Sequence, residues 1–189
     1  MNTADKSLIE RILTARVYDV AKETPLDYAK NLSQRLHNRI FLKREDLQPV
    51  FSFKLRGAFN RMFHLTAEER ARGVVAASAG NHAQGVALAG KTLGIKTTIV
   101  MPKVTPDIKI NAVKSFGGEA VIYGNNFDEA YAHARHLEQE EGMTFVHPFD
   151  DLDVIAGQGT IAMELLRQHQ DPIDAIFICV GGGGLISGI

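Results

Sequence analysis

Apolar and polar residues follow two alternating periods along most of this chain. Short apolar runs, typical of buried strands, alternate with longer segments whose apolar residues recur every three to four positions. The short runs predict strands over 74–77, 96–101, 120–123, 144–147 and 175–180. The longer segments predict helices over 81–93, 106–116, 127–141 and 154–168. This alternation predicts an α/β fold, in which open parallel twisted sheets are covered by helices on both faces.

The first third of the chain follows a less regular pattern. An amphipathic segment predicts a helix over 6–16, and a short apolar run predicts a buried strand over 40–42. A further helix is predicted over 57–65. Thr66, followed three residues later by Glu69, has the spacing of a capping box and predicts the start of another short helix.

Composition narrows the possible classes of function. The 21 basic and 22 acidic residues give a net charge of −1, so we expect neither nucleic acid nor an anionic membrane as a partner. One cysteine excludes an internal disulfide and a multi-cysteine metal cluster, and we expect no metal site. The apolar runs are far shorter than the ~20 residues that span a bilayer, and no secretory signal is found. We therefore expect a soluble, cytoplasmic protein.

Four consecutive glycines, at 181–184, separate the last predicted strand from a predicted helix start. Glycine runs are costly in conformational entropy, so a simple turn explains them poorly. At a helix start they form a phosphate cradle, because backbone N–H groups donate and no Cβ atom obstructs the anion. No Lys-Ser/Thr pair follows, which excludes a P-loop. A dinucleotide-binding module remains an alternative, since the glycine spacing loosely matches that fingerprint.

Three other segments are candidates for chemistry. Residues 78–85 form a small-residue loop after a strand, where Ser78 or Asn81 could cap the helix and His82 could act as a base or be held by local hydrogen bonds. Lys54, between apolar neighbours, is either a surface side chain or a buried amine able to form a Schiff base. Residues 156–160 indicate close helix packing or a ligand contact with equal weight.

Taken together and in this order, these segments closely resemble the fold-type II pyridoxal-phosphate enzymes. The match is to the serine/threonine dehydratases, most closely those of the biosynthetic threonine dehydratase type. The segments that carry the resemblance are 43–46, 48–50, 52–58, 78–85, 149–150, 156–160 and 181–185. The resemblance implies a fold similar to the tryptophan synthase β subunit and pyridoxal 5'-phosphate as the cofactor.

The resemblance also implies roles for individual residues. Lys54 matches the lysine that binds the cofactor covalently and then removes the Cα proton of the substrate. Phe53 matches a residue that packs beside the pyridine ring, and Asn81 matches an asparagine that hydrogen-bonds the phenolic oxygen. The loop implied to bind the substrate carboxylate comprises Ser78, Ala79, Gly80, Asn81 and His82. The loop implied to bind the phosphate comprises Gly181, Gly182, Gly183, Gly184 and Leu185.

The implied activity is dehydration and deamination of L-threonine to 2-oxobutanoate and ammonia, with L-serine giving pyruvate as a side activity. This would be the first step of isoleucine biosynthesis. Serine racemases of the family carry a serine where this chain has Ala79, which favours elimination over racemisation. A catabolic dehydratase, a racemase and a non-catalytic truncated fragment remain the alternatives.

The resemblance implies a domain arrangement that this chain fills only in part. A small inserted α/β domain is expected at 53–145, and residues 1–52 and 146–189 are expected to form an incomplete large domain. The rest of the large domain, the partner of the pyridine nitrogen and a C-terminal regulatory domain are expected beyond residue 189. We expect the full-length enzyme to be a homo-oligomer and to be active where the isolated chain is not.

Overall fold

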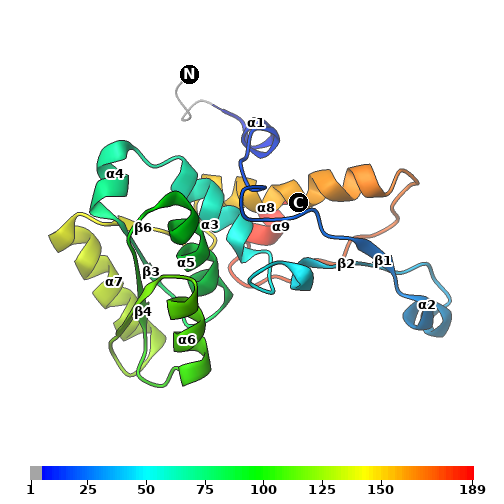
Figure 1. Ribbon diagram of the computed structural model, residues 1–189. Coiled ribbons are helices and arrows are strands. Elements are labelled where there is room, and N and C mark those ends of the chain that lie inside the picture. The colour runs from blue at the N-terminus through cyan, green and yellow to red at the C-terminus, as the bar shows by residue number, and fades with distance from the viewer. Residues whose placement is uncertain (1–5) are drawn as a thin grey trace.

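The computed structural model describes residues 6–189, and its largest sheet has four parallel strands in the order β5-β4-β3-β6 (Figure 1). The strands are β3 (Val74–Ala77), β4 (Thr97–Met101), β5 (Glu119–Ile122) and β6 (Thr144–Phe145). The helices that connect them are α5 (Asn81–Leu93), α6 (Asp107–Ser115) and α7 (Phe127–Glu141). Residues 1–5, part of the segment 1–52 expected in the large domain, lie outside the described residues.

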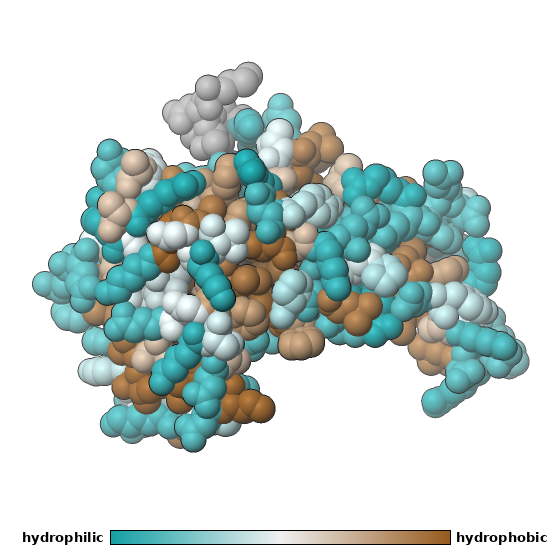
Figure 2. Space-filling model, in the orientation of Figure 1, coloured by the Kyte–Doolittle hydropathy of each residue, from teal (hydrophilic) through white to brown (hydrophobic). Residues whose placement is uncertain are grey.

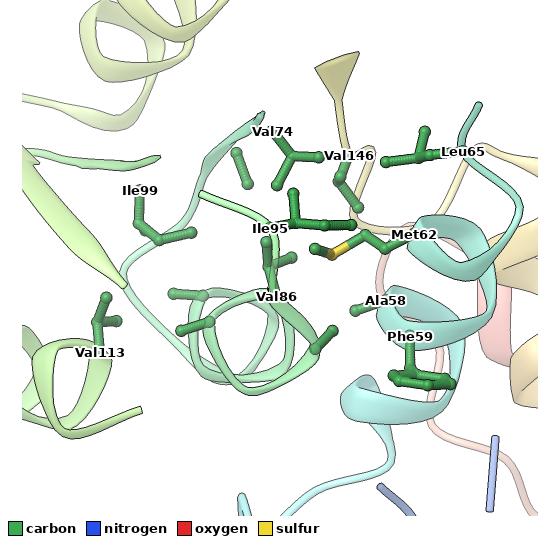
Figure 3. Close-up of a cluster of buried hydrophobic side chains, with 14 of the residues drawn as sticks. Ala58, Phe59, Met62, Leu65, Val74, Val86, Ile95, Ile99, Val113 and Val146 are labelled. Carbon is green, nitrogen blue, oxygen red and sulfur yellow. The ribbon is translucent and has the colours of Figure 1, made fainter. Parts of the chain in front are cut away.

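Both faces of this sheet are covered, and alternate side chains of β3 supply both cores. Val74 and Ala76 belong to a cluster with side chains from α5, α6 and α3 (Lys54–Phe63), which Figure 3 shows in close-up. Val75 and Ala77 pack on the opposite face against α7. A strand buried on both faces has no polar side, which explains why residues 74–77 are uniformly apolar.

A second group of helices packs beside the sheet through glycines. Helix α8 (Leu152–Gln168) lies against α3, where a Cβ atom at Gly157 would come within 2.6 Å of the Cα atom of Gly57. Helix α9 (Gly184–Gly188) lies against α8 in the same way, since a Cβ atom at Gly188 would come within 2.8 Å of the nitrogen of Gly159. The glycines of 156–160 therefore serve close packing. Helix α1 (Leu8–Leu13) also contacts α8.

Residues 26–47 form an extension that reaches the far end of the molecule from the large sheet (Figure 1), and Figure 2 shows hydrophobic as well as hydrophilic residues on its surface. The extension contains a two-stranded antiparallel sheet and short helices. These elements are β1 (Leu26–Tyr28), α2 (Lys30–Leu36), β2 (Phe41–Lys43) and the 3-10 helix η2 (Glu45–Leu47). No helix among residues 6–189 is both long and apolar enough to cross a membrane.

A buried ionic network ties this extension to α3 and α8. The side chains of Arg56 and Glu164 are fully buried and form an ion pair of 2.6 Å. Arg56 also pairs with Glu45 at 2.7 Å, and Lys43 pairs with Glu164 at 2.6 Å. The two cations and two anions balance, as buried charges must. The network therefore fixes helix α3 against the extension two residues after Lys54.

Most of the predicted elements are confirmed, and two features are wrong. The α/β architecture is confirmed, helices 81–93 and 127–141 have their predicted bounds, and the Thr66–Glu69 capping box starts α4 (Ala67–Arg72). The strand predicted over 175–180 is absent, because no other described segment pairs with this backbone, and Phe177 is 98% exposed. The strand predicted over 40–42 exists as β2, but it is not buried, since Leu42 is 48% exposed.

Candidate active site

The strand order of the large sheet reverses between β3 and β6, and this reversal locates the site. The chain runs outward from β3 through β4 to β5 and then returns to β6 on the other side of β3. In parallel sheets, ligands bind at such a reversal, beside the carboxyl ends of the strands. The loops that follow β3 and β6 are residues 78–80 and 146–151, and they contain much of the predicted chemistry.

The loop after β3 leads into helix α5 without a side-chain cap. Gly80 is the N-cap residue, and its N–H donates to the Oγ atom of Ser78 at 3.2 Å. Neither Ser78 nor Asn81 therefore caps the helix. Within residues 6–189, the backbone N–H groups of 81–83 donate no hydrogen bond, and the exposed Asn81 side chain has no partner. The start of α5 thus presents free donors that suit an anion.

The side chain of His82 points into the protein interior. Its ring is buried, and Nε2–H donates to the carbonyl oxygen of Val146 at 2.9 Å. Burial lowers the pKa of His82 to about 4, so the imidazole is neutral near pH 7. Its Nδ1 atom has no hydrogen-bond partner among the described residues. Its side chain holds the loop that follows β6, so we expect any substrate contact from His82 to come from its backbone.

Lys54 is the first residue of α3 and is partly buried. Its Nζ atom donates a hydrogen bond of 2.7 Å to the carbonyl oxygen of Pro148, in the loop after β6. Burial lowers the pKa of Lys54, and the nearby Cys179 partly opposes this shift. Gly85 lets α5 approach closely, because a Cβ atom there would lie 3.1 Å from the backbone of Leu55. Lys54 is therefore a desolvated amine beside the loop that follows β3.

A cavity of about 230 Å³ lies beside Lys54. Its walls come from the start of α3, from the loop after β6 and from the glycine loop. The lining residues are Phe53, Lys54, Phe149, Cys179, Val180, Gly181, Gly182, Gly183, Gly184 and Leu185. The structure thus brings together Phe53, Lys54 and the predicted phosphate loop. The loop 78–82 does not line this cavity. It is linked to the cavity through the segment 146–148, because His82 is hydrogen-bonded to Val146 and Lys54 is hydrogen-bonded to Pro148.

The glycine loop has the geometry of an anion cradle. A Cβ atom at Gly181 or Gly183 would meet nothing within 4 Å, and the φ angle of Gly183 is +90°, which favours glycine. Among residues 6–189, no backbone N–H group from 181 to 186 finds an acceptor. These unpaired donors, with a desolvated amine and an aromatic ring nearby, fit a phosphorylated aldehyde such as pyridoxal phosphate.

Four residues of the site are not found from the sequence: Pro148 beside the cavity, and Phe149, Cys179 and Val180 in its lining. Pro148 contributes only its backbone oxygen, which carries no signal in its residue type. Phe149 belongs to a segment that carries the family resemblance, and an aromatic residue before two aspartates at the end of a strand is a usable signal. Cys179 lies in a segment whose pattern predicts a strand, and a single cysteine argues only against disulfides. Among the described residues, no group of acidic, histidine or cysteine side chains could hold a metal ion.

Comparison with known proteins gives a consistent set of relatives. A family model described as pyridoxal-phosphate dependent enzyme matches residues 17–189. The L-threonine dehydratase biosynthetic IlvA of Burkholderia multivorans is 59% identical over 98% of this chain, and the chain covers 37% of that relative. The biosynthetic, chloroplastic threonine dehydratase of Arabidopsis thaliana is 58% identical over 96% of this chain, which covers 31% of that protein.

Solved structures agree with these sequence matches. The processed form of threonine deaminase isoform 2 from Solanum lycopersicum superposes with a TM-score of 0.93 at 56% identity, covering 96% of this chain and 52% of that one. Maize serine racemase superposes with a TM-score of 0.91 at 36% identity, covering 95% of this chain and 55% of that one. The chain spans about a third of the length of the curated relatives it matches.

Proposed function

The chain belongs to the family of pyridoxal-phosphate dependent enzymes, and from this membership we propose that the whole protein containing it deaminates L-threonine. The products would be 2-oxobutanoate and ammonia, with L-serine giving pyruvate as a side reaction. One observation carries the proposal: the desolvated Lys54 amine and the unpaired donors of the glycine loop line one cavity. Identities of 55–59% to biosynthetic threonine dehydratases support this substrate.

Lys54 would hold the cofactor and move the proton. When bound, pyridoxal phosphate draws electron density from the Cα–H bond of the amino acid. Burial lowers the pKa of Lys54, which favours a neutral amine that can accept the Cα proton at Nζ. The carbonyl oxygen of Pro148 accepts a hydrogen bond from Nζ and would stabilise the ammonium that results. The proton would therefore stay at Nζ beside the cavity.

The two loops would hold the charged groups. The unpaired N–H donors of 181–186 would bind the phosphate, and those of 81–83 would bind the substrate carboxylate at the start of α5. The exposed side-chain amide of Asn81 is free to donate to the phenolic oxygen of the cofactor. Phe53, whose ring lies 5.5 Å from the Nζ atom of Lys54, would pack beside the pyridine ring.

Ala79 favours elimination over racemisation. Racemisation needs a second acid that returns a proton to the opposite face of Cα, and the methyl group of alanine cannot supply one. The high TM-score to maize serine racemase concerns the fold and does not distinguish the two reactions, because the same scaffold carries both.

The test uses the whole protein that contains this chain, loaded with pyridoxal phosphate. We expect 2-oxobutanoate from L-threonine, and we expect Lys54→Ala to lose both this product and the visible absorbance of the lysine-bound cofactor. Lys96→Ala, which removes an exposed lysine, is the matched control and should keep both. Formation of D-serine from L-serine without keto acid would identify a racemase. Tight NAD or ATP binding without pyridoxal-phosphate binding would overturn the proposal.

Three finer points are part of the same proposal. 2-Oxobutanoate would enter isoleucine biosynthesis, as the biosynthetic names of the relatives suggest. The free Cys179 thiol suits a reducing compartment, and we propose the cytoplasm. Exposed apolar side chains on β1 and β2, such as Tyr28 and Phe41, suit burial against further polypeptide, which supports a homo-oligomer.

A further inference from the structure

We propose that Phe149 is a positioning residue for the glycine loop and thereby sets the affinity of the protein for the phosphate group of its cofactor. The inference rests on the proposed function, because it assigns the glycine loop to the cofactor phosphate. It adds Phe149, a residue outside that loop in the segment between β6 and α8. The ring and backbone of Phe149 pack against the loop.

The contact between Phe149 and the loop is close at two alternate glycines. A Cβ atom at Gly182 would lie 2.2 Å from the Cδ1 atom of the Phe149 ring. A Cβ atom at Gly184 would lie 2.7 Å from the carbonyl oxygen of Phe149 and 2.9 Å from its Cα atom. Real Cβ atoms essentially never show separations below 3.0 Å, so a side chain at either glycine would force the loop or Phe149 to shift.

The other two glycines of the loop have free space at their Cβ positions. A Cβ atom at Gly181 or at Gly183 would meet nothing within 4 Å. One side of the loop is therefore packed against Phe149, and both the loop and Phe149 line the cavity. Because the N–H groups of 181–186 have no acceptor among the described residues, no hydrogen bond from them fixes the loop on the cavity side. These donors are held in place by the packing of the loop on Phe149, together with the packing of α9 on α8.

Phe149 is itself held firmly. The Nδ1 atom of His147 accepts hydrogen bonds from the N–H of Phe149 at 3.3 Å and from the N–H of Asp150 at 2.7 Å. The rings of His147 and Phe149 meet edge to face with centroids 4.6 Å apart. Upstream, the N–H of Val146 donates to the carbonyl oxygen of Val75 in β3. Residues 146–149 thus hold the Phe149 ring, and the glycine loop that packs on it, at a fixed position relative to strand β3.

The first experiment compares two ligands that differ only in the phosphate. The apo form of the whole protein is titrated with pyridoxal phosphate and with pyridoxal, which carries the same aldehyde without the phosphate. We expect Phe149→Ala to weaken pyridoxal-phosphate binding about tenfold and to leave pyridoxal binding within about twofold. Phe127→Ala removes a half-exposed ring on α7 and is the matched control, which should change neither affinity. An equal loss for both ligands would overturn the proposal.

The second experiment tests the contact itself. Gly182→Ala should weaken pyridoxal-phosphate binding about tenfold, because its new methyl group collides with the Phe149 ring. In a Phe149→Ala background the collision is removed, so adding Gly182→Ala should cost less than about threefold. An equal cost in both backgrounds would overturn the proposal. If Phe149→Ala does not fold, Phe149→Leu takes its place in both experiments, with a smaller selective loss expected.

The two proposals fail in distinguishable ways. If the unmodified protein binds no pyridoxal phosphate, the proposed function is wrong, and the role of Phe149 that depends on it is wrong as well. If it binds pyridoxal phosphate and Phe149→Ala binds as tightly, only the role of Phe149 is wrong. A pyridoxal-phosphate affinity that falls while pyridoxal affinity holds supports both.

Discussion

Lys54 and Pro148, 94 residues apart in sequence, are joined by a hydrogen bond of 2.7 Å from the Nζ atom to the carbonyl oxygen. The bond fixes the amine at the wall of the cavity, between α3 and the loop after β6. A carbonyl oxygen only accepts, so Nζ uses one of its hydrogens here and its reactive lone pair, when present, is directed elsewhere. The protonation state of Lys54 therefore controls when the site can capture an aldehyde.

The first prediction concerns the pH dependence of cofactor capture. Only neutral Lys54 attacks an aldehyde, and burial lowers the pKa of this amine from 10.5. The rate of capture by the apoprotein, followed by absorbance after rapid mixing with pyridoxal phosphate, should therefore rise with pH with a midpoint below pH 10.5. Cys179 opposes the shift in the pKa of Lys54, so Cys179→Ser should move the midpoint to lower pH. A midpoint that is unchanged or higher would contradict this.

The second prediction concerns the buried pair of Arg56 and Glu164. Both side chains are fully buried, so Glu164→Gln leaves Arg56 and Lys43 with Glu45 as the one remaining anion of the network and one positive charge uncompensated. We expect the free energy of unfolding of the whole protein to fall by about 3 kcal/mol in urea denaturation at pH 7. Glu119→Gln breaks an exposed pair with Lys96 and should change the free energy of unfolding by less than about 0.5 kcal/mol. Equal effects of the two substitutions would contradict the assignment.

The same pair predicts a loss of stability in acid. Burial raises the pKa of Glu164, but its bonds to Arg56 and Lys43 outweigh this and hold it below 4.5. A carboxyl whose pKa is lower in the folded state stabilises the fold above its unfolded pKa. This stabilisation is lost as the pH falls from 4.5 through the lower folded value. The difference between the unmodified protein and Glu164→Gln should therefore shrink over that range.

Local signals explain which elements were predictable. Helices 81–93 and 127–141 end at Gly94 and Gly142, both with positive φ angles of +67° and +64°, and such stops depend only on neighbouring residues. The strand over 175–180 was wrong because a strand needs a partner backbone, which its own sequence cannot supply. Helix α2 and strand β1 were missed because short elements are stabilised by packing more than by local preference.

The candidate site was likewise predictable only in part, because some of its contacts are created by the fold. The glycine loop was predicted from residue type and spacing, whereas the residue type of Lys54 left two interpretations open and only the family resemblance assigned its role. The carbonyl oxygen of Pro148 was missed, because every residue has such an oxygen and only the fold brings this one to Nζ. The support from Phe149 likewise depends on a contact between segments more than thirty residues apart, visible only as a Cβ collision at Gly182.

The next prediction concerns the close approach of α3 and α8. A Cβ atom at Gly157 would lie 2.6 Å from the Cα atom of Gly57 and 2.7 Å from the carbonyl oxygen of Arg56. Both are backbone atoms, which cannot rotate away, so Gly157→Ala should lower the free energy of unfolding by about 1–3 kcal/mol. Gly80→Ala is the matched control, since nothing lies within 4 Å of its Cβ position, and its stability should be unchanged. A stable Gly157→Ala protein would show that the helices separate easily.

The last prediction concerns His82. Burial lowers its pKa from 6.5 to about 4, so the folded state resists protonation while the unfolded state does not. A histidine with a lowered folded pKa costs stability as the pH falls through this range. Relative to His82→Gln, which cannot titrate but can still donate to Val146, the unmodified protein should lose about 3 kcal/mol between pH 7 and pH 4. Urea denaturation across that range measures it, with the exposed His136→Gln as control. Parallel pH profiles for the unmodified protein and His82→Gln would show that the imidazole titrates freely.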